Sequence, residues 1–428
     1  MTGSLLRRVV FWIVDFFSGS IVRKNYNDIS KSFNKDYDNC VALSLILEHA
    51  IKTVPYYLGG TTVNIKEFPV VSKLSYKENY KSFQSSRFMN SKIYKMSTSG
   101  STGIPFVVNQ DYGKRKRNHA DVIFYNKLCN QKLGDKFVFF RVWNESNRKK
   151  YFERKMQNIL PFNILYLDGK TLDEIRSLLK KDKKITSALG YGSTYELLGK
   201  HLLACGDTAD MFSIKSLITS SEVMGLETKR LLNKVLGCQV FDRYSNQECG
   251  IIAQTTDCSD IFYVNRASYY VELLKLNSNE AVAIGEVGRI VITDLYNYAM
   301  PIIRYDTGDL AINHKSLNGQ VVEMRSIQGR QVDVIYDTQG KQLTPHTWSV
   351  YMWKFDRISQ YQFIQNGEKD YVLKVIDNSG FYSEKEIDTT LRSILGRDAN
   401  IEIFFVDELP ILASGKFKKT ICNYVPNL

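Results

Sequence analysis

A loop of hydroxyl side chains and glycines is the segment of this sequence best suited to chemistry. Residues 97–105 read Ser-Thr-Ser-Gly-Ser-Thr-Gly-Ile-Pro. Glycines let backbone N–H groups turn towards an anion, and the hydroxyls add further donors, so such a loop can cradle phosphate groups. The loop lacks the Gly-x4-Gly-Lys-Ser/Thr pattern of a Walker loop, and alone it is equally compatible with a surface turn.

Five further polar motifs follow this loop in order along the chain. They are Ser220-Ser221-Glu222, Arg243-Tyr244-Ser245-Asn246-Gln247-Glu248, Arg304-Tyr305-Asp306-Thr307-Gly308-Asp309, Gly329-Arg330-Gln331-Val332-Asp333 and Leu409-Pro410-Ile411-Leu412-Ala413-Ser414-Gly415-Lys416. The ordered set resembles the adenylate-forming (AMP-binding) enzyme superfamily. Within it, the sequence is most similar to the phenylacetate–CoA ligase-like branch, including relatives associated with capsular polysaccharide biosynthesis. Residues 68–73, 190–193 and 299–305 add to this similarity, which covers the chain from residue 65 to its end.

The resemblance implies an ATP-dependent ligase that activates a carboxylic acid as an acyl-adenylate, with release of pyrophosphate. The acyl group would then pass to coenzyme A, or to an amine or hydroxyl of a sugar precursor in capsular or exopolysaccharide biosynthesis. The implied cofactors are ATP and Mg²⁺, with coenzyme A as one acceptor. The alternative is a non-catalytic, nucleotide-binding relative that acts as a scaffold in polysaccharide assembly.

The resemblance also assigns roles to individual residues. Those that would hold the phosphates of ATP are Thr98, Ser99, Gly100, Ser101, Thr102 and Gly103. Ser221 and Glu222 would lie beside adenine, at the carboxyl end of a predicted strand, where open α/β sheets bind ligands. Tyr244 would stack on adenine, and the carboxylate of Glu248 would bind Mg²⁺.

Three further residues complete the implied site. Asp309 would accept hydrogen bonds from both ribose hydroxyls, because one carboxylate offers two oxygens. Arg330 would meet ribose or phosphate near the boundary between the domains. Lys416 would neutralise the acyl carboxylate and the α-phosphate, which is electrostatic preorganisation rather than acid–base catalysis. Each has a plainer interpretation, since Asp309 fits a turn and Lys416 fits a basic tail with Lys418 and Lys419.

The sequence departs from the family pattern at three positions. Phe106 follows the proline of the phosphate loop, where many members of the superfamily have lysine. Val332 stands two residues after Arg330, where an acidic hinge residue is frequent, and Asp333 follows it. Ser245 replaces the usual glycine after the adenine-stacking tyrosine. The resemblance therefore leaves the hinge residue, on which the second half-reaction depends, unassigned.

The elements that must position these motifs alternate between strands and helices. Predicted strands at 137–140, 187–191, 216–219 and 239–241 alternate with predicted helices at 172–181, 193–203 and 226–236, which indicates parallel βαβ units. After residue 263 the segments 269–276 and 288–293 favour an antiparallel region. A small α+β unit follows, with predicted strands at 361–364, 371–376 and 401–406 and a helix at 383–395. We therefore expect an α/β protein with a large domain (1–328) and a small mobile C-terminal domain (329–428) that carries Lys416.

The first 20 residues predict an amphipathic helix. One face of this helix carries Leu5, Leu6, Val9, Val10, Ile13, Phe16 and Phe17. The longest apolar run is far below the roughly 20 residues that span a bilayer. Packing against the body of the protein is one interpretation. The other is a helix on the inner face of the membrane, with Trp12, Arg7 and Arg8 at the headgroups, on an otherwise cytoplasmic protein.

The basic residues, the cysteines and the histidines form no recognisable motif. Lys and Arg exceed Asp and Glu by 57 − 45 = 12. The basic clusters, among them 114–117 and 180–184, are short and scattered and lack a nucleic-acid-binding motif, so we expect solvated faces rather than nucleic-acid binding. The seven cysteines lack the spacing of zinc or redox motifs and predict free thiols. The five histidines show no pairing with a nucleophile and are expected on the surface or in packing.

Overall fold

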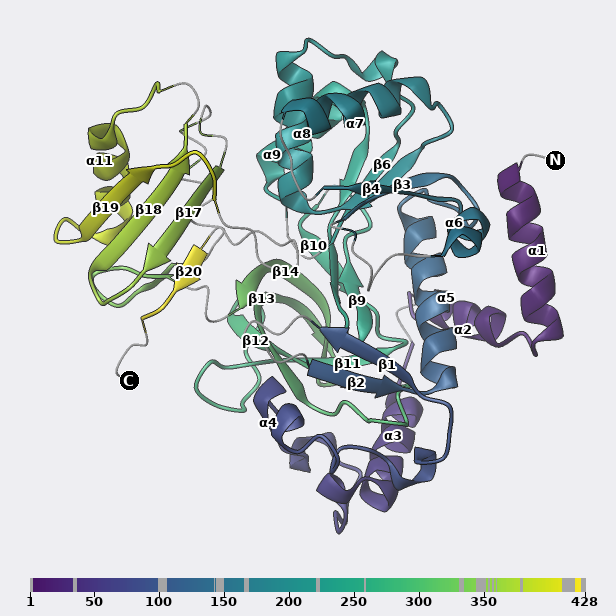
Figure 1. The fold of residues 1–428 in the computed structure, drawn as a ribbon. Helices are drawn as coiled ribbons and strands as arrows, with labels where there is room; N and C mark the ends of the chain where they lie inside the picture. The colour runs from purple at the N-terminus through teal and green to yellow at the C-terminus, as the bar shows by residue number, and fades with distance from the viewer. Residues whose placement is uncertain are drawn as a thin grey trace. The chain divides into compact units, whose positions relative to one another are not determined.

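The fold was analysed in a computed structural model, in which the chain forms two compact units. One consists of Met1–Thr307 and Ala311–Ile327, and the other of Gly308–Leu310 and Gln328–Leu428 (Figure 1). The structure describes residues 3–33, 37–98, 106–141, 143, 150–164, 169–220, 224–257, 259–330, 335–343, 352, 355, 358, 360–377, 380–409 and 420–424.

A parallel five-stranded sheet forms the first layer of the larger unit. Its strands, in spatial order, are β4 (Ile159–Asn163), β3 (Phe137–Arg141), β5 (Ser187–Gly190), β6 (Ser216–Thr219) and β7 (Gln239–Phe241). The connecting helices are α6 (Tyr151–Gln157), α7 (Gly169–Lys181), α8 (Gly192–Ala204) and α9 (Leu226–Leu236). All four strand pairs are parallel, which confirms the predicted βαβ units. Helices α7, α8 and α9 each bury an apolar face in the core of this sheet, as Ile175, Leu198 and Leu232 show.

A seven-stranded sheet follows in the sequence. Its spatial order is β11 (Tyr269–Leu274), β12 (Val287–Asp294), β13 (Tyr305–Leu317), β14 (Gln320–Arg330), β10 (Ile261–Val264), β9 (Gly250–Gln254) and β8 (Arg243–Asn246). The pairs β8–β9, β9–β10, β10–β14 and β11–β12 are antiparallel. The pattern after residue 263 predicts this for β11 and β12, but the antiparallel region begins earlier, at β8. A two-stranded antiparallel ribbon, β1 (Tyr94–Thr98) and β2 (Phe106–Gln110), leads into helix α5 (Tyr112–Leu128).

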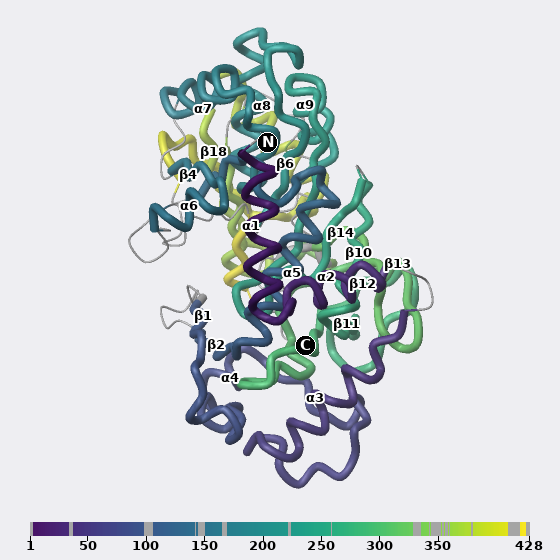
Figure 2. The backbone as a smooth tube through the Cα atoms, turned by 90° about the vertical axis from the view of Figure 1, so that its right-hand side faces the viewer, coloured from purple at the N-terminus to yellow at the C-terminus, as the bar shows by residue number. Residues whose placement is uncertain are grey.

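The N-terminal region is helical. It contains α1 (Gly3–Phe17), α2 (Ile21–Lys31), α3 (Cys40–Thr53), α4 (Lys73–Glu78) and the short 3-10 helices η1 (Pro55–Tyr57), η2 (Ile65–Glu67) and η3 (Ser86–Phe88); η4 (Ala209–Met211) comes later in the chain. Figure 2 looks directly onto α1, which lies on the outside of the larger unit. In the part of the chain that the structure describes, no helix combines the length and apolar character needed to cross a bilayer.

Helix α1 is held to the protein by its polar residues. The buried carboxylate of Asp15 accepts hydrogen bonds from the backbone N–H groups of Val22 (3.0 Å) and Arg23 (2.9 Å), at the first turn of α2. Arg8 donates to the carbonyl of Leu133 (3.1 Å), and the guanidinium of Arg23 lies 4.2 Å from the ring centre of Trp12. These contacts support the packing interpretation for Trp12 and Arg8, which meet protein groups where the membrane interpretation expects lipid headgroups.

The basic cluster at 114–117 is not the solvated face that we expected. Lys114 and Arg117 are fully buried. Lys114 Nζ lies 2.6 Å from a carboxylate oxygen of Asp294, and Arg117 Nη1 lies 2.7 Å from one of Asp28. The reason is that Asp111 caps α5 by accepting from the N–H of Lys114 (2.9 Å), and residues three apart then share the helix face that turns to the core.

The smaller unit contains a four-stranded sheet with the spatial order β19 (Asn400–Phe405), β18 (Asp370–Ile376), β17 (Gln360–Gln365) and β20 (Thr420–Cys422). Helix α11 (Glu384–Leu395) begins at a capping box between Ser383 and Glu386 and buries Ile387, Leu391 and Leu395 in this unit's core. A short ribbon pairs β15 (Ile335–Tyr336) with β16 (Gln342–Leu343). The three strands and the helix predicted after residue 360 are thus all present.

Asp207 follows α8 and bonds two residues of α7. We expect these bonds to stabilise the folded protein. Its carboxylate accepts hydrogen bonds from Arg176 Nε (2.5 Å) and Lys180 Nζ (2.5 Å). The bond from Arg176 is the largest cause that lowers the pKa of Asp207 from 3.8 to about 2. Since the unfolded state binds the proton more tightly, this stabilisation is complete above pH 3.8 and is lost as the pH falls towards 2.

We therefore expect Asp207→Asn to lower the free energy of unfolding at pH 7 by about 1–2 kcal/mol, because Arg176 and Lys180 are partly solvated. Urea unfolding of wild type and variant at pH 7 and pH 3 checks this. The difference between the two proteins should narrow at pH 3, and a difference of equal size at both pH values would contradict the ion-pair explanation.

Candidate functional site

Glu248 lies in a tightly held turn between β8 and β9. The backbone carbonyl of Glu248 accepts from the side-chain amide of Gln110, at the end of β2 (3.0 Å). The next N–H, of Cys249, donates to the side chain of Asn246 (2.7 Å). Gly250 follows with φ +117°, a conformation that L residues rarely adopt. The sequence between Asn246 and Gly250 thus folds into one defined turn.

The carboxylate of Glu248 is buried beside a cation. The residue is 5% exposed, and its Oε1 lies 3.2 Å from Lys73 Nζ and accepts from the hydroxyl of Tyr305 (3.4 Å). A buried carboxylate needs such partners because desolvation disfavours its charge. Among the described residues, all of these side-chain contacts fall on Oε1 and none on Oε2. A hard cation such as Mg²⁺ fits that remaining carboxylate oxygen.

Lys73 and Tyr305 reach Glu248 because two distant segments lie side by side. Val71 forms a parallel bridge with Tyr305. The N–H of Val71 donates to the carbonyl of Arg304 (2.9 Å), and the N–H of Asp306 donates to the carbonyl of Val71 (2.9 Å). Lys73 then begins α4 behind the N-cap Ser72. This geometry explains why the motifs at 68–73 and 299–305 occur together in one protein.

The side chain of Arg304 holds these two segments together. Its guanidinium donates two bonds of 3.0 Å to the two carboxylate oxygens of Glu272 and a third to the carbonyl of Phe68 (2.9 Å). Burial raises the pKa of Glu272, and the bonds from Arg304 oppose that rise. A planar guanidinium that binds a carboxylate with two parallel bonds holds its own position as well as its charge. Arg304 therefore positions the chain on both sides of it, at Phe68 and at Tyr305.

Tyr244, the predicted adenine-stacking residue, lies on β8. Its hydroxyl donates to Thr307 Oγ1 (3.2 Å), which in turn donates to the carbonyl of Ile290 (3.0 Å). The ring packs against the main core of the larger unit. Asp309, the predicted ribose ligand, lies on β13 after Gly308, whose φ is +76°.

Several predicted residues are not covered by this geometry. The residues Ser99, Gly100, Ser101, Thr102, Gly103, Ser221, Glu222 and Lys416 lie outside the described part of the chain. Thr98 ends β1 and Arg330 ends β14, and only their backbones are described. Of the predicted site residues, the structure describes Tyr244 on β8 and Glu248 in the turn that follows it, and it places Lys73, Gln110 and Tyr305 in contact with Glu248.

Asp242 is a buried carboxylate, next to the predicted motifs, that sequence reasoning missed. It is buried and accepts from the hydroxyl of Thr219 (2.9 Å) and the N–H of Met224 (3.1 Å), with Lys229 Nζ at 2.6 Å. Thr219 and Met224 flank Ser221 and Glu222, so Asp242 anchors both ends of that motif. The available signal was its place directly before Arg243 and Tyr244, at the end of β7.

Comparisons with known proteins identify similar sequences. Residues 335–423 match the model of the CapK C-terminal domain. The protein CapK of Staphylococcus aureus is 22% identical over 379 residues, which cover 85% of this chain and 81% of CapK.

Solved structures show the same fold. One is a 2-hydroxyisobutyryl-CoA ligase in its postadenylation state, with a TM-score of 0.69 and 16% identity, covering 89% of this chain and 88% of the ligase. ATP-bound MatB from Rhodopseudomonas palustris has a TM-score of 0.55 and 16% identity, covering 75% of this chain and 65% of MatB. A benzoate CoA ligase from Burkholderia xenovorans LB400 has a TM-score of 0.53, also at 16% identity, covering 78% and 68%. This chain therefore has the fold of the adenylate-forming CoA ligases, and its C-terminal region matches the CapK C-terminal domain.

Proposed function

We propose that this protein is an ATP-dependent ligase that activates a carboxylic acid as an acyl-adenylate. The observation that carries the proposal is the buried carboxylate of Glu248, held by Lys73 and Tyr305 in a chain with the fold of adenylate-forming ligases. A carboxylate oxygen of the acid attacks the α-phosphorus of ATP, and the bond to the β-phosphate breaks to release pyrophosphate. Bound Mg²⁺ would neutralise phosphate charge, with Glu248 as its protein ligand.

The residues around Glu248 have complementary parts in this reaction. Tyr305 and Gln110 hold the Glu248 turn in place, so that its carboxylate keeps one orientation. Lys73 balances the buried charge before substrate binds. We assign Tyr244, whose hydroxyl donates to Thr307, to stacking on adenine. We assign Lys416 to the acyl carboxylate and the α-phosphate, Asp309 and Arg330 to the ribose side, and residues 98–103 to the terminal phosphates.

ATP–pyrophosphate exchange with a panel of aromatic, aliphatic and hydroxy acids tests this proposal. We expect at least one acid to support exchange in the wild-type protein. Lys416→Ala should reduce that exchange by about 10²-fold or more, because one electrostatic group is removed from the transition state. Lys419→Ala is the matched control and should leave exchange unchanged. Equal exchange in the wild type and Lys416→Ala would contradict the role of Lys416, and no exchange with any acid would contradict the ligase.

For the acceptor, we propose coenzyme A or an amine or hydroxyl of a sugar precursor, in polysaccharide assembly. The similarity to CapK supports the second class, and the fold shared with CoA ligases supports the first. Once an acid is identified, the preformed acyl-adenylate can be offered to the enzyme with coenzyme A alone or with nucleotide sugars alone. Faster release of AMP with one class identifies the acceptor.

We further propose that α1 contacts an anionic membrane surface through its outer face. This face includes Leu6, Ile13, Val14, Phe16 and Phe17, with Phe16 69% and Phe17 82% exposed. An exposed apolar helix face on a protein with a net charge of +12 suits the surface of an anionic bilayer.

The double variant Phe16→Asp/Phe17→Asp should therefore reduce cosedimentation with phosphatidylglycerol vesicles by at least about tenfold. Its melting temperature should stay close to that of the wild type, because both side chains are exposed. Neutral phosphatidylcholine vesicles serve as the control. Wild-type protein that does not sediment with anionic vesicles would refute the membrane contact.

A further inference from the structure

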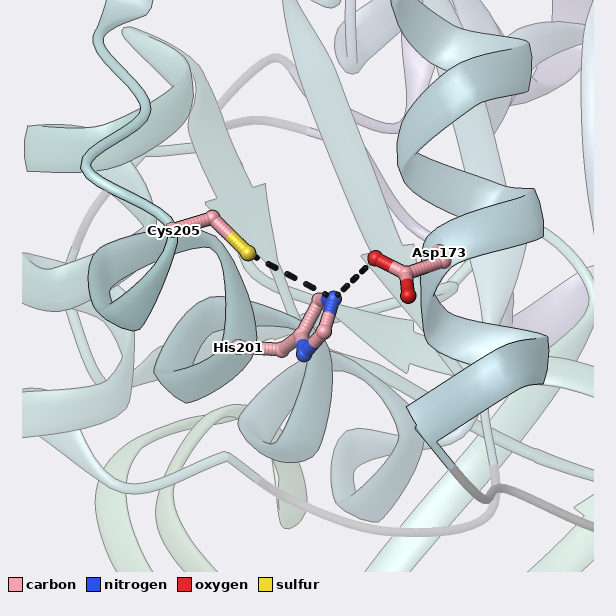
Figure 3. Close-up of side chains that lie close together, drawn as sticks. All are labelled: Asp173, His201 and Cys205. Carbon is pink, nitrogen blue, oxygen red and sulfur yellow. Dashed lines mark hydrogen bonds and ion pairs between the residues drawn. The ribbon is translucent and has the colours of Figure 1, made fainter.

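Three metal-binding types of side chain converge on one point between α7 and α8, away from the Glu248 turn. Asp173 lies on α7, His201 lies in the last turn of α8, and Cys205 is the C-cap of α8. His201 Nε2 lies 2.9 Å from Asp173 Oδ1 and 3.7 Å from Cys205 Sγ (Figure 3). The three donor atoms all lie within 4.8 Å of one another. We expected the histidines on the surface or in packing, without a nucleophile beside them; His201 does have a thiol beside it, that of Cys205.

The contacts of His201 distinguish a metal site from a nucleophilic triad. In a triad, one ring nitrogen faces the nucleophile and the other faces the carboxylate. Here both dashed lines in Figure 3 end at the same nitrogen, Nε2. One nitrogen cannot accept a proton from the thiol while it donates one to the carboxylate. An arrangement of N, O and S donors about a shared point is instead what a metal ion requires.

The distances and the charges suit Zn²⁺. With zinc–nitrogen and zinc–oxygen bonds of about 2.0–2.1 Å and a zinc–sulfur bond of about 2.3 Å, tetrahedral ligands lie roughly 3.3–3.6 Å apart. The observed 2.9 Å and 3.7 Å from His201 bracket these separations, and the carboxylate oxygen of Asp173 lies within 4.8 Å of the sulfur of Cys205, so modest side-chain shifts bring the three donors to ligand distances. A thiolate and a carboxylate balance the charge of the dication, and the exposed side chain of Asp173 leaves the fourth position open to water.

The surrounding structure holds these donors in place. His201 and Cys205 are four residues apart, and the N–H of Cys205 donates to the carbonyl of His201 (3.0 Å), so the helical turn sets their spacing. Leu172 and Leu202 bury the faces of α7 and α8 in the same core. The nearby cations Arg176 and Lys180 both form ion pairs with Asp207. The carboxylate of Asp173 instead contacts the ring of His201.

We propose that Asp173, His201 and Cys205 bind Zn²⁺ as three protein ligands, with water in the fourth position. Binding replaces the hydrogen bond between His201 and Asp173 with two metal bonds and releases the proton of the Cys205 thiol. The ion then links α7 to α8 in the parallel-sheet region. This site is separate from the Mg²⁺ that we assign to Glu248 and has the softer donors that zinc selects and magnesium does not.

Titration of the full-length, metal-stripped protein with Zn²⁺ alone, in competition with a chromophoric chelator, tests the proposal. Co²⁺ is the second probe, because a cobalt–thiolate bond gives a charge-transfer absorption band. We expect one ion to bind each chain and the cobalt complex to show the thiolate band. Cys205→Ser should abolish the thiolate band and weaken Zn²⁺ binding at least about tenfold. His201→Ala should also weaken Zn²⁺ binding at least about tenfold.

Cys40→Ser is the matched control, because Cys40 is also exposed and belongs to no such cluster among the described residues. It should leave both readouts unchanged. Circular dichroism of each variant establishes that it is folded. Wild-type protein that binds no Zn²⁺, or a Cys205→Ser variant that keeps the cobalt–thiolate band, would overturn the proposal. Neither readout depends on ATP or an acid, so the result stands apart from that of the ligase assay.

Discussion

Replacing Glu248 by Gln is expected to reduce ATP–pyrophosphate exchange on the order of 10²- to 10³-fold, the effect of removing one group from a preorganised electrostatic site. Glutamine keeps the size of the side chain and can still accept a hydrogen bond from Tyr305. It loses the negative charge that suits a hard cation. The Mg²⁺ concentration needed for half-maximal exchange should rise in the variant.

Two comparisons separate this effect from damage to the fold. Glu280→Gln alters an exposed glutamate paired with Lys275, and it should leave exchange within about twofold of wild type. The melting temperature of Glu248→Gln should remain close to that of wild type, because the ammonium of Lys73 is partly exposed and can be hydrated. Full activity in a folded Glu248→Gln protein would show that this carboxylate is not the metal ligand.

Replacing Arg304 by Met is expected to lower the free energy of unfolding by about 3–5 kcal/mol, the usual cost of leaving one partner of a buried ion pair alone. Glu272 would lose two bonds of 3.0 Å, and Phe68 would lose the bond to its carbonyl. Arg304 has φ +44°, and Met retains the same backbone strain, so the variant reports on the guanidinium. Urea unfolding measures the change.

The double variant Arg304→Met/Glu272→Met supplies the internal control. It removes both charges, so it should recover a substantial part of the stability lost in Arg304→Met. Lys52→Met breaks the exposed pair with Glu48 and should change stability by less than about 0.5 kcal/mol. If the double variant recovers no stability relative to Arg304→Met, the unpaired charge of Glu272 is not the cause of the loss.

The elements of the parallel sheet could be predicted because each is defined locally. The strand at 216–219 and the helix at 226–236 have the predicted bounds. Buried parallel strands are short apolar runs, and their helices carry apolar residues at helical spacing. These patterns depend on near neighbours in the sequence. The architecture that follows from them, an α/β unit followed by a smaller α+β unit, was therefore accessible without a structure.

The partners of Glu248 could not be predicted in the same way. Lys73 is 175 residues before Glu248 in the sequence, and it reaches the carboxylate only because Val71 pairs with Tyr305. The same limit applies to Lys114 and Arg117, which look like a solvated basic run until Asp294 and Asp28 are placed beside them. A charged residue that becomes buried needs a partner of opposite charge, but the sequence does not show which residue that partner is.

The transfer of labelled oxygen from the acid to AMP tests the central claim most directly. The acid that best supports exchange is prepared with oxygen-18 in its carboxylate and incubated with ATP, Mg²⁺ and an acceptor. If a carboxylate oxygen attacks the α-phosphorus, that oxygen stays with phosphorus when the acceptor takes the acyl group. We predict AMP that carries one labelled oxygen and unlabelled pyrophosphate. Labelled inorganic phosphate formed together with ADP would instead reveal an acyl-phosphate and contradict adenylate formation.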